Sequence, residues 1–137
     1  MLPVVAIAEV EEGLQRGSDP HSAQAQEIRR WIAGYPHHLP FDDNSVQPYA
    51  LLRAELIRRY GPEKAKRGKK IWVEDLCDRI SGKTLGVDER DLLIASVAIQ
   101  YNCVLVTRDR MNQIRDVADS LRERNYPTEL RVQHWEP

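Results

Sequence analysis

Apolar residues recur at intervals that change along the chain, and each interval predicts a type of element. An apolar, β-branched run at residues 2–7 predicts a strand end that passes into a helix. Helical spacing then predicts five further helices, while one continuous apolar run and one alternating segment predict strands. The expected helices cover residues 19–33, 43–60, 71–80, 88–101 and 112–125, and the expected strands or extended segments cover residues 37–42, 103–106 and 130–135.

Residues that start or stop helices set the expected boundaries. The helix after the first strand should hold Glu9 in its first turn and stop at Gly13 or Gly17. The Ser-Asp-Pro sequence before the second helix makes Asp19 its expected N-cap. Asp43 or the residue after it should cap the third.

The alternation of strands and helices predicts an α/β layered fold with a largely parallel sheet. Because parallel strands need a crossover, the run at residues 103–106 should be an interior strand with helices around it. A length of 137 residues fits a single domain, residues 1–137. Hydrophobic residues make up 42% and charged residues 30% of the chain, with no membrane-length apolar run and no secretory leader, so we expect a cytoplasmic protein.

The net charge of -1 does not suggest nucleic-acid binding, but the distribution of charge along the chain is more informative. Between Arg53 and Lys70, eight basic residues stand against two acidic ones, a local charge of +6 that leaves about -7 elsewhere. Such a segment can face phosphates beside an acidic metal pocket, or it can be an ordinary solvated helix end. As RNA contacts we assign the basic residues Arg58, Arg59, Lys66, Arg67, Lys69, Lys70 and Arg108.

Three carboxylates fall where an open parallel sheet binds its ligands, beyond the carboxyl ends of its strands. Glu9 and Asp91 are expected near helix starts, and Asp109 follows the strand at residues 103–106. Oxygen ligands of this kind suit Mg²⁺ or Mn²⁺, and without a cation they would repel one another and RNA. Each acid also has a plainer explanation, since helix starts favour acids and turns favour Asp.

Three segments resemble the PIN-domain ribonucleases of the VapC toxin family. VVAIAEVEEG resembles the strand and acidic helix start of that family, DLLIASVAIQYNCVLVTRD its helix, strand and Thr-Arg-Asp turn, and LRVQHW its closing strand. The resemblance implies a PIN-like three-layer fold, with a mostly parallel sheet flanked by helices. It also implies an Mg²⁺- or Mn²⁺-dependent endoribonuclease, the toxin of a toxin–antitoxin pair, which is often dimeric and neutralised by a small antitoxin.

Carried over residue by residue, the resemblance makes Glu9, Asp91 and Asp109 the metal-binding and catalytic acids. Thr107 matches the small hydroxyl residue of the turn, and Asn112 stands where many members have a further Asp. The chain departs from the family at its start, where members open with a strand ending in Asp, followed by a helix. We therefore expect the first βα unit to be absent, as in a late-called start codon, a degraded gene or a deliberate truncation.

Two other functions compete with the ribonuclease. The first is a truncated and inactive PIN remnant that only binds an antitoxin or RNA. The second is a different parallel α/β protein, such as a receiver or nucleotide-binding domain, although the Gly-rich phosphate loop that a nucleotide site would need is missing from this sequence.

Overall fold

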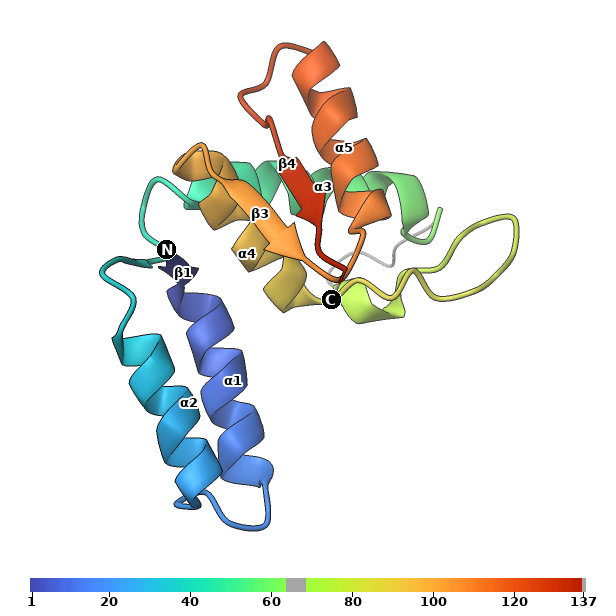
Figure 1. Ribbon diagram of the computed structural model, residues 1–137. Helices are drawn as coiled ribbons and strands as arrows, with labels where there is room; N and C mark the ends of the chain where they lie inside the picture. The colour runs from blue at the N-terminus through green and yellow to red at the C-terminus, as the bar shows by residue number, and fades with distance from the viewer. Residues whose placement is uncertain (64–68, 137) are drawn as a thin grey trace. The chain divides into compact units, whose positions relative to one another are not determined.

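The computed structural model describes residues 1–63 and 69–136 and divides into two compact units, Met1–Phe41 and Asp42–Pro137. Each unit is described by itself, and Figure 1 labels the elements. The first unit contains β1 (Leu2–Pro3), α1 (Val4–Arg16), α2 (Ala23–Ala33) and β2 (His38–Leu39). The second contains α3 (Val46–Tyr60), the 3-10 turn η1 (Val73–Asp75), α4 (Glu89–Gln100), β3 (Val104–Thr107), α5 (Asn112–Glu123) and β4 (Arg131–His134).

In the first unit, two helices connect two very short parallel strands, β1 and β2. The predicted end of α1 is confirmed, because Gly17 donates its N–H to the carbonyl of Leu14. The predicted start of α2 is wrong: Ser22 is the N-cap, and its side chain accepts the N–H of Ala25. Asp19 instead accepts the N–H of His21 in the preceding turn.

A bidentate ion pair joins the two helices of the first unit. Arg29 on α2 donates from Nε and Nη2 to the two carboxylate oxygens of Glu11 on α1, at 2.9 and 2.8 Å. The same guanidinium donates to the carbonyl of Pro20 at 2.6 Å. These hydrogen bonds from Arg29 are the first cause that lowers the pKa of Glu11 to about 2.

The second unit has a continuous apolar core made by α3, α4 and α5. In α5 the buried residues follow the spacing i, i+3, i+4 and i+7, which places them on one face. In α4 five consecutive residues are buried, so this helix is enclosed on most sides. The fully buried members of the core include Leu52, Leu56, Val73, Leu92, Ala95, Val117 and Ala118.

β3 and β4 form a parallel pair in the register Val104↔Arg131 to Thr107↔His134. The face of β3 that carries Leu105 packs against the core. On the opposite face Val104 and Val106 are 47% and 58% exposed. The prediction of an interior strand is wrong in this respect, because within the described residues β3 pairs with β4 alone.

A buried carboxylate ties α3 to α5. Glu55 is only 4% exposed, and its side chain accepts hydrogen bonds from Arg58, Arg59 and Arg124 at 2.5 to 2.9 Å. The hydrogen bond from Arg58 is the largest cause that lowers the pKa of Glu55 to about 2; burial opposes it, and the bonds from Arg59 and Arg124 add to it. Charge pairing therefore compensates for burying this acid.

Two further predictions differ from the structure. The third helix begins after Ser45 rather than after Asp43 or its neighbour. Residues 71–80 form only the short turn η1 instead of a helix. Ile80, which the expected helix would have placed on its apolar face, is 98% exposed. Parallel strands with helical connections nevertheless confirm the predicted α/β class. None of the helices in the described ranges has the length and apolar character of a membrane span.

Candidate metal and nucleic-acid site

Two of the predicted site residues belong to elements at one end of the second unit, where β3 and β4 finish and α4 and α5 begin (Figure 1). α4 runs away from this end and β3 runs back toward it after a short turn. The first turn of α4, which carries Asp91, therefore lies at the same end as Asp109, which follows β3. The elements that carry these two residues thus share one end of the unit, while the expected meeting of the acids at a common metal site stays a prediction.

Asp91 is held in place by a capping box. Its backbone N–H donates to Oδ1 of Asp88 at 2.9 Å, and its own Oδ2 accepts the N–H of Asp88 at 3.0 Å. This reciprocal pair satisfies two donors at the start of α4. It fixes the Asp91 carboxylate on the first turn, where the helix dipole favours negative charge.

A second acid in this turn, Glu89, is paired with neighbouring side chains. Glu89 accepts hydrogen bonds from the Tyr49 hydroxyl and from Nε of Arg53, the latter at 3.0 Å. Its backbone N–H donates to Oε1 of Glu74, on η1, at 3.1 Å. Burial and the hydrogen bond to Glu89 raise the pKa of the Tyr49 hydroxyl. Glu89 therefore serves as an anchor between α3 and α4.

The turn after β3 presents Asp109 to solvent. The Asp109 N–H donates to Oγ1 of Thr107 at 3.1 Å, and Oδ1 of Asp109 accepts the N–H of Met111 at 3.0 Å. Met111 takes a left-handed conformation with φ of 48°, which directs the chain into α5. Thr107 thus shapes the turn that holds Asp109, and Asn112 follows as the first, exposed residue of α5.

An aromatic residue that the sequence did not single out lies beside this turn. Trp135 donates its backbone N–H to the carbonyl of Thr107 at 2.9 Å, which extends the β3–β4 pairing by one residue. The guanidinium of Arg108 lies 4.8 Å from the centre of the Trp135 ring, a cation–π contact. The sequence signals for Trp135 were its position at the end of the alternating segment and its place in the LRVQHW segment.

Glu9 occupies a different place from the predicted one. Because α1 begins at Val4, Glu9 lies in the second helical turn and is partly buried. Pro3 is the N-cap, so the apolar residues after it enter the helix instead of extending the strand. Glu9 belongs to the first compact unit, and its approach to Asp91 and Asp109 stays a prediction.

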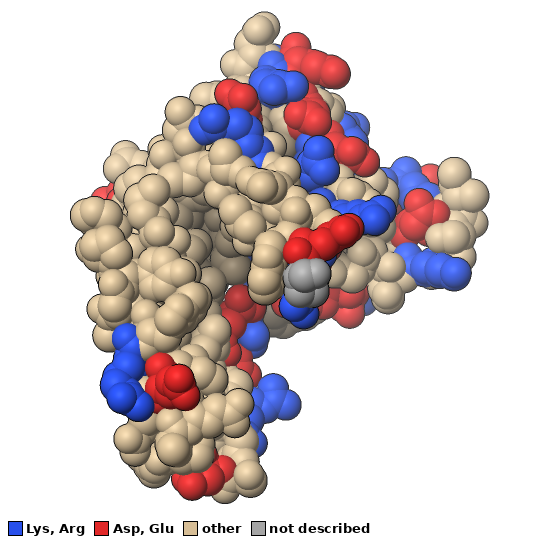
Figure 2. All heavy atoms as spheres, in the orientation of Figure 1, with Lys and Arg blue, Asp and Glu red and all other residues tan. Residues whose placement is uncertain are grey.

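Apart from Arg108, the predicted basic contacts fall into three groups. Arg58 and Arg59 are engaged with Glu55, at 2.5 and 2.9 Å. Lys66 and Arg67 lie outside the described residues. Lys69 and Lys70 line a pocket with Trp72. Blue and red side chains adjoin one another in Figure 2, in keeping with basic residues that pair with acids.

The donor chemistry at this end suits a hard divalent cation. Within residues 1–63 and 69–136 no three Asp, Glu, His or Cys side chains form a group that could hold a metal ion. Magnesium, however, is commonly bound through one or two carboxylates together with waters and substrate phosphates. The chemistry of Asp91 and Asp109, two carboxylates, is of the kind that Mg²⁺ or Mn²⁺ accepts, and a cation held by both residues stays a prediction.

Comparison with known proteins gives a likeness in structure alone. No family model matches the sequence, and no curated relative does. The fold is similar to that in the crystal structure of VapBC2 from Rickettsia felis bound to a DNA fragment from their promoter, with a TM-score of 0.59 and 21% identity over 98% of this chain and 73% of that one. It is also similar to DNA-bound VapBC from Salmonella typhimurium, with a TM-score of 0.58 and 18% identity over 98% and 74% of the two chains. These likenesses support a VapC-like PIN fold.

Proposed function

We propose that this protein is a metal-dependent endoribonuclease that hydrolyses RNA phosphodiester bonds as the toxin of a toxin–antitoxin pair. The observation that carries the proposal is the placement of Asp91 and Asp109 at one end of a VapC-like fold. Each is held by backbone hydrogen bonds, so each presents its carboxylate from a defined turn. The structural neighbours are VapBC assemblies, which supports a VapB-type antitoxin as the protein partner.

In this mechanism Asp91 and Asp109 would hold Mg²⁺ or Mn²⁺, and Glu9 as a further ligand stays a prediction from the sequence. A bound divalent cation lowers the pKa of its water and neutralises charge on a phosphodiester. Asp109 is kept in its turn by Thr107, and Arg108 lies next to it as a donor for a phosphate oxygen. Asn112 begins the following helix and offers an uncharged amide at the same end. The protein is proposed to act as a homodimer.

The test is Mn²⁺-dependent cleavage of total RNA by the wild-type chain, Asp91→Asn and Asp109→Asn. Asn at position 91 keeps an oxygen that can accept the Asp88 N–H, so the fold should survive while the charge is lost. We expect each variant to lose about 10- to 100-fold or more of the activity. Asp116→Asn, an exposed acid on α5, is the matched control and should cleave normally.

Equal cleavage by the wild type and both variants would overturn the assignment of these acids. A folded wild-type chain that binds RNA or an antitoxin but cleaves no RNA would favour the second candidate, a binding module without catalysis. Circular dichroism of each variant separates loss of the site from loss of the fold.

A further inference from the structure

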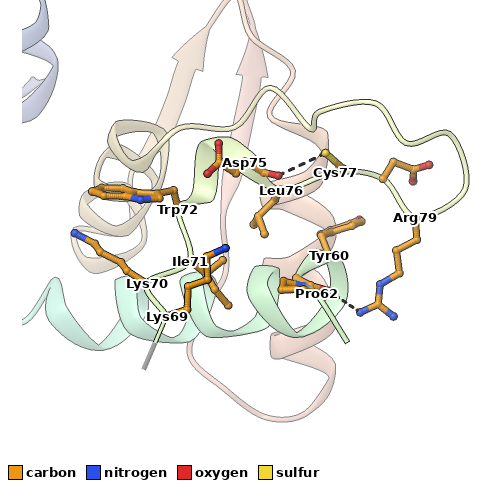
Figure 3. Close-up of a pocket in the computed structure, with 12 residues that line it drawn as sticks. Tyr60, Pro62, Lys69, Lys70, Ile71, Trp72, Asp75, Leu76, Cys77 and Arg79 are labelled. Carbon is orange, nitrogen blue, oxygen red and sulfur yellow. Dashed lines mark hydrogen bonds between the residues drawn. The ribbon is translucent and has the colours of Figure 1, made fainter. Parts of the chain in front are cut away.

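A pocket of about 590 Å³ opens between the end of α3 and the segment around η1. Figure 3 shows Trp72 and Lys70 on one side, Arg79 on the other, and Tyr60 and Leu76 between them. Leu76 is 2% exposed, so the floor is the outer surface of the core. The volume lies in the range of small-molecule sites, which are commonly about 300–1,000 Å³.

We propose that this pocket binds an unpaired nucleotide of RNA, a few positions along the strand from the cleaved bond. The proposal rests on the proposed ribonuclease function and specifies where the RNA substrate of that enzyme is bound. Trp72 would stack on the base, while Lys69, Lys70 and Arg79 would contact phosphates. Single-stranded nucleic acids are bound in this way, by aromatic faces beside a basic groove.

The exposure of Trp72 and its contact with Lys70 support a stacking role. Trp72 as a residue is 52% exposed although it borders an apolar floor. The ammonium of Lys70 lies 3.8 Å from the ring centre. A cation on an exposed indole can move to a phosphate when a base takes its place, because both contacts are electrostatic and open to water.

Arg79 is fixed where it can receive a phosphate. Its Nη2 atom donates to the carbonyl of Gly61 at 3.2 Å and lies 3.5 Å from that of Arg58. Two backbone acceptors hold one edge of the guanidinium, and the planar group has further N–H donors for an anion. A held guanidinium loses less conformational freedom on binding than a mobile one.

The lining of the pocket has one more basic residue than acidic residues. Three basic residues line it against two acids, Asp75 and Asp78. Asp78 is committed to its own loop, because its Oδ1 accepts the N–H groups of Ile80 and Ser81 at 3.1 and 2.6 Å. An exposed indole beside basic side chains suits a nucleotide, because the base can stack on the indole while the phosphate contacts the cations. An acidic peptide would use the cations and leave the indole without a partner.

The wall of the pocket is bonded to the turn that carries Asp91. Arg53 donates to the carbonyl of Ile71 at 2.8 Å and to Glu89 at 3.0 Å. Glu74, two residues after Trp72, accepts the Glu89 N–H at 3.1 Å. The pocket wall and the turn that carries Asp91 are therefore neighbouring parts of the second unit.

The experiment measures binding without cleavage. A fluorescently labelled single-stranded oligoribonucleotide is titrated in EDTA, and its anisotropy is followed for the wild type, Trp72→Ala and Trp72→Phe. We expect Trp72→Ala to weaken binding by about five- to hundred-fold, and Trp72→Phe to keep most of the affinity because its ring still stacks. Trp31→Ala is the matched control: this tryptophan of the first unit is 60% exposed and should not matter.

The double variant Lys69→Ala/Lys70→Ala should reduce the slope of log K against log salt by about 1 to 1.5. Equal affinity of Trp72→Ala and wild type, or an acidic peptide that binds in competition while RNA does not, would overturn the proposal. Because the titration in EDTA contains no free metal ion, it measures binding without cleavage. Binding that depends on Trp72 would therefore support the nucleotide site even if cleavage were never seen. Melting curves of each variant exclude unfolding as the cause.

Discussion

Replacing Glu55 by Gln would remove one buried charge and leave the shape of the side chain almost unchanged. Glu55 accepts hydrogen bonds from three arginines, and Arg124 reaches it from beyond α5. An amide keeps one oxygen acceptor but turns the other oxygen into a donor that faces guanidinium groups. The arginines are 26% to 64% exposed, so water can solvate them again after the change.

The magnitude follows from the pKa of this carboxyl, which folding lowers from 4.5 to about 2. A difference of this size between folded and unfolded states corresponds to about 3 kcal/mol at neutral pH. Because the folded pKa lies below the unfolded one, the contribution is complete above about pH 4.5 and disappears as pH falls toward 2. Glu55→Gln should therefore cost about 2–3 kcal/mol at pH 7 and almost nothing near pH 2.

The assay is urea unfolding followed by circular dichroism at several pH values between 7 and 2.5, with a melting curve at pH 7. For a unit of this size the loss should lower Tm by roughly 10–20 °C. Glu129→Gln is the control, since Glu129 is an exposed acid of the same unit. A Glu55→Gln variant that is as stable as the wild type at pH 7, or equally dependent on pH, would refute the reasoning.

Three further predictions concern a helix cap and two glycines. Asp88→Ala should destabilise the protein by about 1 kcal/mol in urea unfolding because the capping box loses its acceptor, whereas Asp88→Ser should retain most of the stability; equal midpoints for both variants would contradict this. Gly61→Ala should cost about 1–3 kcal/mol, since a Cβ would lie 2.3 Å from the carbonyl oxygen of Ile57. Gly13→Ala should instead stabilise α1 by about 0.5–1 kcal/mol, because Gly13 is inside the helix with nothing within 4 Å of the added Cβ; melting curves that rank the two in the opposite order would be inconsistent with these contacts.

The helices were predicted well where apolar residues recur with a strong helical period. The helix from about Asp88 to Tyr101 was expected and is observed as α4, with Asp88 as its cap. The helix from Asn112 was likewise confirmed as α5. In both, apolar spacing and burial agree, so local pattern and tertiary packing favour the same answer.

The prediction of a helix at residues 71–80 was wrong because the apolar residues at helical spacing do not share a buried face. Of the residues that suggested a helix at 71–80, Leu76 is buried, whereas Trp72 is 52% and Ile80 98% exposed. Spacing alone could not distinguish a helix from a segment whose apolar residues face different surroundings.

The candidate site was only partly accessible from the sequence. The positions of Asp91 in the first turn of a helix and of Asp109 beyond a strand were predicted from local pattern and are observed, whereas their role stays a prediction. The contact of Glu74 with Glu89 joins segments 15 positions apart, and that of Arg53 with Glu89 joins segments 36 apart. Such pairs depend on how the chain packs, and residue spacing carries no information about them.

The exposed side of β3 has a consequence for behaviour at high concentration. A strand with two outward valines and, within the described residues, a single hydrogen-bonded neighbour offers a template to any extended chain that meets it. Natural proteins protect such edges with charges, prolines or covering segments, and Val104 and Val106 bring none of these to the edge themselves. Self-association through this strand should therefore grow with concentration, and a lysine at position 106 should suppress it.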